Sequence, residues 1–184
     1  MDLWGLVAEI LIDDNDIHIN IPIKFYGEAA TKDNIDKTIE AIQNTWTGKF
    51  GSYSVITTVE IVDISSDRIS NSVLLIDDHD TSYVNNKQYG VFYLKQDFFG
   101  IDYYPATVSH EAGHLMGAND KYYEEINASG ERTTFPMEGY ENNIMATLDG
   151  VVEESIIEEI LSYPKNIISK SEKTPLEIPG GCTK

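Results

Sequence analysis

The segment SHEAGHLMGAND, residues 109–120, constrains the fold more than any other, because it carries two histidines four residues apart. Residues i and i+4 of an α-helix project from the same side, with Cβ atoms about 5 to 6 Å apart. His110 and His114 can therefore bind one metal ion if this segment is helical. Gly117 tolerates positive φ, so it predicts that the helix ends there and that the chain turns back to bring Asp120 towards both histidines.

These residue types in this pattern indicate a catalytic zinc site. Imidazole nitrogens and carboxylate oxygens bind Zn²⁺ at about 2.0 to 2.2 Å, and three protein ligands leave the fourth position open. Glu111 lies about 100° around the helix from His110, so it borders the metal without being aimed at it, as a general base should. The alternative interpretation is a solvated helix with two incidental histidines.

Composition limits the class of protein. A chain of 184 residues with 41% hydrophobic residues predicts one domain with its own core. The formal net charge of −18 argues against binding to nucleic acid or to an anionic membrane. No apolar run approaches the roughly 18 to 20 residues of a membrane helix, and Met1 is followed by Asp2 instead of the basic residues of a secretory signal. The single cysteine, Cys182, excludes an internal disulfide framework. If the Cys182 thiolate occupied the open position of the zinc ion, it would keep the enzyme latent.

Hydrophobic periodicity predicts an α/β fold in which strands and helices follow one another without repeats. Thr31 or Asp33 is the expected N-cap of the first helix, and Gly48 or Gly51 its end. Strands are expected within 17–26, 52–64, 72–77, 81–85 and 90–97, helices within 31–51, 106–118 and 151–164, and an irregular stretch at 119–149. The expected organisation is one domain, residues 1–165, followed by a loose C-terminal tail, residues 166–184.

The pattern H-E-x-x-H-x-x-G-x-x-D at 110–120 resembles the zinc signature of the metzincin endopeptidases, in the snapalysin-like variant whose third ligand is Asp. The segment ENNIMAT offers Met145 for the Met-turn that these enzymes have downstream of the zinc helix. The resemblance implies a twisted, mostly parallel five-stranded sheet with an antiparallel edge strand, formed here by residues 81–85, and a C-terminal helix. It also implies peptide-bond hydrolysis with one zinc ion, in which Glu111 moves the proton between water and the leaving amine.

One position departs from the resemblance. Astacin-like and serralysin-like metzincins have a Tyr two residues after the Met, where this chain has Thr147. The residue that stabilises the oxyanion is therefore not assigned; Tyr122, Tyr123 and Tyr140 are the nearby candidates, but packing or lining of the cleft explains each of them better.

Three other features bear on metal binding. His79 lies in the acidic segment IDDHDTS, which could hold Ca²⁺ or form only a solvated turn. His18 alternates within a strand and is expected at the surface. Glu138 or Glu141 could replace Asp120 as third ligand, as in gluzincins, but those enzymes supply the Glu from a second helix that is not evident here.

The start of the chain offers a second resemblance. The segment DLWGL, residues 2–6, is similar to the junction at which rearrangement-hotspot (Rhs) and other polymorphic-toxin proteins pass into their C-terminal toxins. It implies a peptidase domain delivered into a target cell as part of a larger protein, and an immunity or inhibitor protein as partner. Leu3 stands where that junction has Pro, and an ordinary N-terminal turn capped by Trp4 is the alternative interpretation of the segment. The alternatives are a plain secreted peptidase, a cell-wall peptide amidase and a catalytically silent, zinc-stabilised binding module; the presence of Glu111 favours an enzyme.

Overall fold

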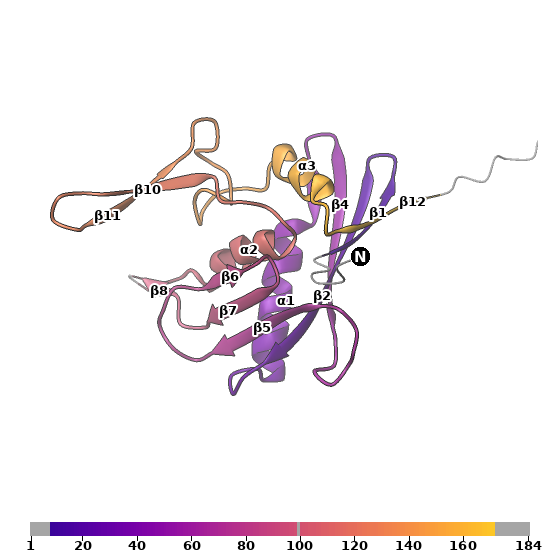
Figure 1. Cartoon of the computed structure of the whole chain (residues 1–184), viewed down its shortest axis with the longest axis horizontal. Coiled ribbons are helices and arrows are strands. Elements are labelled where there is room, and N and C mark those ends of the chain that lie inside the picture. The colour runs from indigo at the N-terminus through magenta and orange to yellow at the C-terminus, as the bar shows by residue number, and fades with distance from the viewer. Residues whose placement is uncertain (1–7, 99, 172–184) are drawn as a thin grey trace, which may run out of the picture.

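The computed structural model describes residues 8–98 and 100–171, so the predictions for residues 2–6 and for Cys182 lie outside the described residues. Within them the chain forms an α/β fold with a mixed, mostly parallel sheet and three helices (Figure 1). In chain order the elements are β1 (Glu9–Asp13), β2 (Asp16–Tyr26), α1 (Lys32–Trp46), β3 (Gly48–Phe50), β4 (Tyr53–Ile61), β5 (Asn71–Ile76), β6 (Tyr83–Asn85), β7 (Tyr89–Tyr93), β8 (Asp97–Phe98), β9 (Ile101–Asp102), α2 (Tyr104–Leu115), β10 (Tyr122–Ile126), β11 (Arg132–Pro136), α3 (Glu154–Ser162) and β12 (Ile167–Lys170).

Strand β2 is the centre of the main sheet because it pairs with three other strands. It runs antiparallel to β1 and parallel to β4 and β5. The sheet continues through β7, which is parallel to β5, and reaches β6, which is antiparallel to β7. The sequence predicts five strands, but this sheet has eight, because β1, β3 and β12 also join it.

One face of the sheet is covered by α1 and α2, and this contact forms the core (Figure 1). Alternate side chains of β2 point towards this core, and they are all fully buried: Ile17, Ile19, Ile21 and Ile23. Trp46, the last residue of α1, is also fully buried, and its Nε1 donates a hydrogen bond to the carbonyl oxygen of Ser109 in α2 at 2.9 Å. The two helices are thereby joined beside the residues of the metal-ligand motif.

The helix boundaries follow from local chemistry. Thr31 is the N-cap of α1, and its side chain accepts a hydrogen bond from the backbone N–H of Asn34. Helix α2 begins beside Pro105, whose fixed φ suits a first turn. Helix α3 buries Ile156, Ile157 and Ile160 and ends before Pro164. No described helix is long and apolar enough to cross a membrane.

Two segments differ from the sequence-based predictions. The stretch 119–149 is not wholly irregular, because β10 and β11 pair in register as an antiparallel hairpin that projects from the body of the molecule (Figure 1). The predicted tail does not begin at residue 166, because β12 pairs parallel with β1. The residues of β12 are exposed and show no alternation of burial, so only a partner strand far away in the sequence defines this element.

Candidate metal centre

Helix α2 positions the first two candidate ligands on a largely buried surface. His110 is 8% exposed and His114 is half-buried, one helical turn further on. The helix stops at Met116, and Gly117 adopts the positive φ of +106° that the sequence predicts. The backbone N–H of Ala118 donates to the carbonyl oxygen of Gly113 at 2.9 Å, which closes the turn and sends the chain back towards the histidines.

Asp120 completes the group of candidate ligands. Its Oδ1 atom lies 3.3 Å from His110 Nε2 and 3.1 Å from His114 Nε2. One ligand atom from each residue lies within 4.8 Å of those of the other two. A tetrahedral ion with ligands at about 2.0 to 2.1 Å separates its ligand atoms by about 3.3 Å, so these distances fit one zinc ion.

The hydrogen bonds of the two rings also fit a metal. His110 Nδ1 lies 2.8 Å from the carbonyl oxygen of Ile144, and His114 Nδ1 lies 3.0 Å from that of Ala118. Because a carbonyl only accepts, these contacts assign the ring proton to Nδ1 and leave Nε2 with its lone pair. Neither Nε2 can then donate to Asp120, whose buried Oδ1 has no hydrogen-bond donor among the described residues. A cation between the three atoms would satisfy all of them.

The charges of the metal-free group are strongly coupled. Burial alone would raise the pKa of Asp120, but the two histidines hold it well below its usual range. Burial lowers the pKa of His110, yet contacts with Asp120 and with the Ile144 carbonyl outweigh this effect and the net direction is upward. In the metal-free group Asp120 is therefore held as a carboxylate, which is the form that binds a cation.

Glu111 is the buried acid next to these ligands. It is 7% exposed, and its Oε2 atom has no hydrogen-bond partner among the described residues. Burial raises the pKa of Glu111 to about 7, although the neighbouring His110 and His114 oppose the shift. A carboxyl group with this pKa exchanges a proton readily near neutral pH.

Met145 lies directly beneath α2. It is fully buried, and a Cβ atom on Gly113 would come within 2.5 Å of its Sδ atom and 3.0 Å of Trp46 Cζ2. The turn around it is closed by Asn143, whose Oδ1 accepts from the backbone N–H of Met145 at 2.8 Å. The carbonyl oxygen of Ile144, the residue before Met145, lies 2.8 Å from His110 Nδ1, so this turn helps to orient the first candidate ligand.

The three candidate tyrosines occupy different environments. The Tyr122 ring lies 6.4 Å from that of His110, and burial with the nearby carboxylates raises the pKa of Tyr122 to about 12. Tyr123 stacks on Phe135 at 5.6 Å and is 48% exposed. Tyr140 packs against the core, with Lys121 Nζ 5.4 Å from its ring. Among them, Tyr122 is the tyrosine that contacts a candidate ligand.

The alternative ligands lie elsewhere. Glu138 and Glu141 are exposed, and Glu141 accepts a hydrogen bond from the backbone of Gly139. His79 lines a separate cavity of 510 Å³ with Asp80 and Leu148. Among the described residues, His110, His114 and Asp120 form the one group of three or more His, Cys, Asp or Glu side chains close enough together to hold a metal ion.

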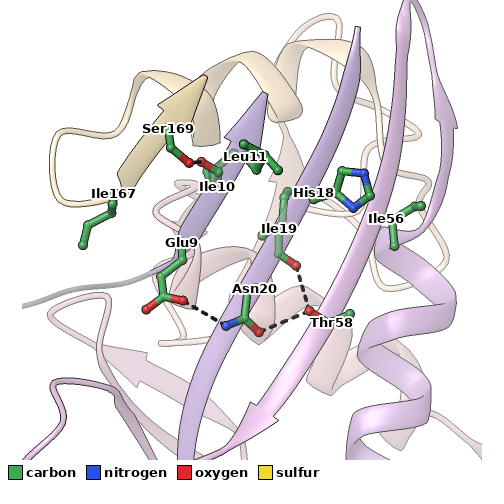
Figure 2. Close-up of a pocket in the computed structure, with 10 residues that line it drawn as sticks. All are labelled: Glu9, Ile10, Leu11, His18, Ile19, Asn20, Ile56, Thr58, Ile167 and Ser169. Carbon is green, nitrogen blue, oxygen red and sulfur yellow. Dashed lines mark hydrogen bonds between the residues drawn. The ribbon is translucent and has the colours of Figure 1, made fainter. Parts of the chain in front are cut away.

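A further pocket lies on the opposite face of the sheet from the core. The pocket has a volume of about 390 Å³. Among the residues that line it, Leu11, His18 and Ile56 lie side by side on β1, β2 and β4 (Figure 2). Asn20 donates to Glu9 at 3.0 Å on its floor. None of the candidate ligands lines this pocket, and His18 is the exposed residue that the sequence predicts.

Two residues near the centre carry no signal in the sequence. Lys87, in the turn between β6 and β7, donates a hydrogen bond to the Ala118 carbonyl that His114 also contacts. Glu159, on α3, contacts the residues on both sides of Asp120. Lys87 follows two asparagines in an ordinary turn, and Glu159 is one of several acidic residues in an amphipathic helix, so neither stands out.

No family model matches the chain, and no curated protein matches it significantly.

Proposed function

We propose that this chain is a zinc endopeptidase with a metzincin-like fold. The observation that carries the proposal is the convergence of His110, His114 and Asp120 on one point, with the buried carboxyl group of Glu111 beside them. Three protein ligands are what a catalytic zinc site requires, and a base next to them is what hydrolysis requires.

The topology supports the metzincin-like part of the proposal. Strands β4, β2, β5 and β7 are neighbours and parallel, and β6 lies antiparallel at the edge. Along the chain, α1 follows β2. Helix α2, the Met145 turn and α3 come after β7. This is the order that the resemblance in the sequence implies.

Zinc in this site would polarise the scissile carbonyl and lower the pKa of the attacking water. Glu111 accepts a proton from that water and then delivers it to the nitrogen of the leaving amine. In the metal-free site burial raises the pKa of Glu111 to about 7, and this preference for the protonated form favours uptake of the proton from the water. Tyr122 remains protonated, since its pKa is about 12, and can donate a hydrogen bond to the carbonyl oxygen as negative charge develops on it.

The substrate is proposed to be an extended peptide. Strand β6 pairs with β7 on one side, and its other edge pairs with no strand among the described residues. A free strand edge can bind an extended chain through backbone hydrogen bonds. Binding along an open edge accommodates residues on both sides of the scissile bond, which favours an endopeptidase.

The test is incubation of the zinc-loaded chain with a mixed proteome, followed by identification of new N-termini. The Glu111→Gln variant is the control, because it retains the three ligands and removes the base. Wild-type cleavage should exceed that of the variant by about 10²- to 10⁴-fold. Equal cleavage by a zinc-replete variant would remove Glu111 from the mechanism, and release of amines only from cell-wall peptides would indicate an amidase.

We also propose that the domain acts as a toxin inside a recipient cell, on the strength of the DLWGL segment in the sequence. A producing cell then needs an inhibitor, and the net charge of −18 favours a partner with a basic surface whose binding weakens as salt rises. Cytoplasmic expression in a susceptible bacterium should arrest growth with the wild type but not with Glu111→Gln. Harmlessness of an active enzyme would favour a plain secreted peptidase.

A further inference from the structure

The loop that carries Asp120 is held by residues from the C-terminal part of the fold. The ring of Tyr163 lies against Gly117, where a Cβ atom would come within 2.4 Å of Tyr163 Cγ. Asn166 Nδ2 donates to the carbonyl oxygens of Met116 at 3.0 Å and of Ile160 at 2.7 Å. These contacts fix the beginning of the loop to α3 and to the residues just after it.

Glu159 makes the contacts closest to the candidate ligand. Its Oε1 atom accepts from the backbone N–H of Asn119 at 3.0 Å and from Asn119 Nδ2 at 2.5 Å. Its Oε2 atom lies 2.6 Å from Lys121 Nζ. One carboxylate therefore contacts the residue before Asp120 and the residue after it, but not Asp120 itself.

This ion pair is shielded from solvent. The side chains of Lys121 and Glu159 are 15% and 21% exposed, whereas most other ion pairs of the fold lie at the surface. Hydrogen bonds to a charged group in such surroundings are stronger than those between neutral groups. The backbone of Lys121 is also fixed, because its N–H donates to the carbonyl oxygen of Met145 at 2.7 Å.

We propose that Glu159 is a positioning residue for the metal centre, which acts by fixing Asp120 in the orientation that binds the ion. The inference rests on the proposed zinc site. His110 and His114 are preorganised by their helix, but Asp120 stands on a loop and would otherwise be ordered only when the metal binds. Residues that orient metal ligands typically change metal affinity by roughly 10- to 100-fold when they are removed.

The test is zinc affinity, measured by competition with a chromophoric chelator. Glu159→Ala should weaken zinc binding by roughly 10- to 100-fold, and Glu159→Gln should have a smaller effect, because it keeps an oxygen that accepts from Asn119. Glu158→Ala is the matched control, since Glu158 is the neighbouring exposed acid on the same helix. Circular dichroism shows whether each variant is folded; if Glu159→Ala is not, Glu159→Gln against Glu158→Gln supplies the comparison.

A second pair of variants identifies the route of the effect. If Glu159 acts through Asp120, then Glu159→Ala should have little further effect on zinc affinity in a chain that already carries Asp120→Ala. Wild-type affinity in the folded Glu159 variants, or an undiminished loss in the Asp120→Ala background, would overturn the inference. A wild-type chain that does not bind zinc would instead overturn the proposed function.

Discussion

Gly113 is the residue whose replacement tests most directly how the Met145 turn supports the metal-ligand helix. An alanine Cβ would lie 2.5 Å from Met145 Sδ, 3.1 Å from its Cε and 3.0 Å from Trp46 Cζ2. Both side chains would have to adjust, since Met145 and Trp46 are fully buried. Overpacking of this kind costs about 1 to 3 kcal/mol.

The magnitude depends on an opposing effect of the backbone. Alanine stabilises a helix interior by about 1 kcal/mol relative to glycine. The net loss for Gly113→Ala should therefore be about 0 to 2 kcal/mol in the wild-type background. When Met145→Ala has removed the thioether, Trp46 can move into the space, so the same Gly113→Ala change should be neutral or stabilising by up to about 1 kcal/mol.

The assay is a double-mutant cycle by urea unfolding at equilibrium, with the metal removed from all four proteins. A coupling free energy of about 1 to 3 kcal/mol between Gly113 and Met145 is expected. The Gly113→Ala chain should also bind zinc more weakly, because a displaced turn moves the Ile144 carbonyl away from His110 Nδ1. Equal destabilisation by Gly113→Ala in both backgrounds would show that the contact with Met145 does not require glycine there.

Three further predictions concern the centre itself. Tyr122→Phe should retain zinc and lower kcat by about 10²- to 10³-fold; an unchanged kcat would exclude the hydroxyl from catalysis. Burial raises the pKa of Glu111 from 4.5 to about 7. The free energy of unfolding of the metal-free protein should therefore fall by up to about 3 kcal/mol as pH rises from 5 to 8, because the unfolded chain loses this proton more readily than the folded one. Urea unfolding should show a smaller dependence on pH for Glu111→Gln. Asp120→Ala should weaken zinc binding in dialysis against low free zinc, whereas Glu141→Ala should not; the reverse result would assign the third ligand to Glu141.

The fold elements that the sequence predicts are those whose pattern is local. The isoleucines of β2 alternate, those of α1 recur at helical spacing, and Thr31 marks the start of the helix. Strand β12 could not be predicted, because its four residues are all exposed and its partner lies at the other end of the chain. The β10–β11 hairpin consists largely of exposed residues and lacks the alternation that identifies a half-buried strand.

The same distinction holds for the candidate centre. The spacing of His110 and His114 and the position of Gly117 predict where Asp120 returns, since helix geometry and a single turn relate all of them. Glu159 lies 40 positions beyond Asn119, and nothing in its own segment distinguishes it from Glu158. Residues that orient ligands are selected by the tertiary fold, and local patterns do not reveal them.

The pairing of β1 with β12 has a consequence for synthesis. Glu9 and Ile167 are paired residues, and the loop with Asp120 is held by residues up to Asn166. During translation these partners are made after both histidines and Asp120, and contacts of high sequence separation cannot form until both segments have left the ribosome. A nascent chain that already contains both histidines and Asp120 therefore still lacks the framework that fixes them. If the proposed function is correct, the centre is therefore expected to reach its final geometry only after β12 has been made.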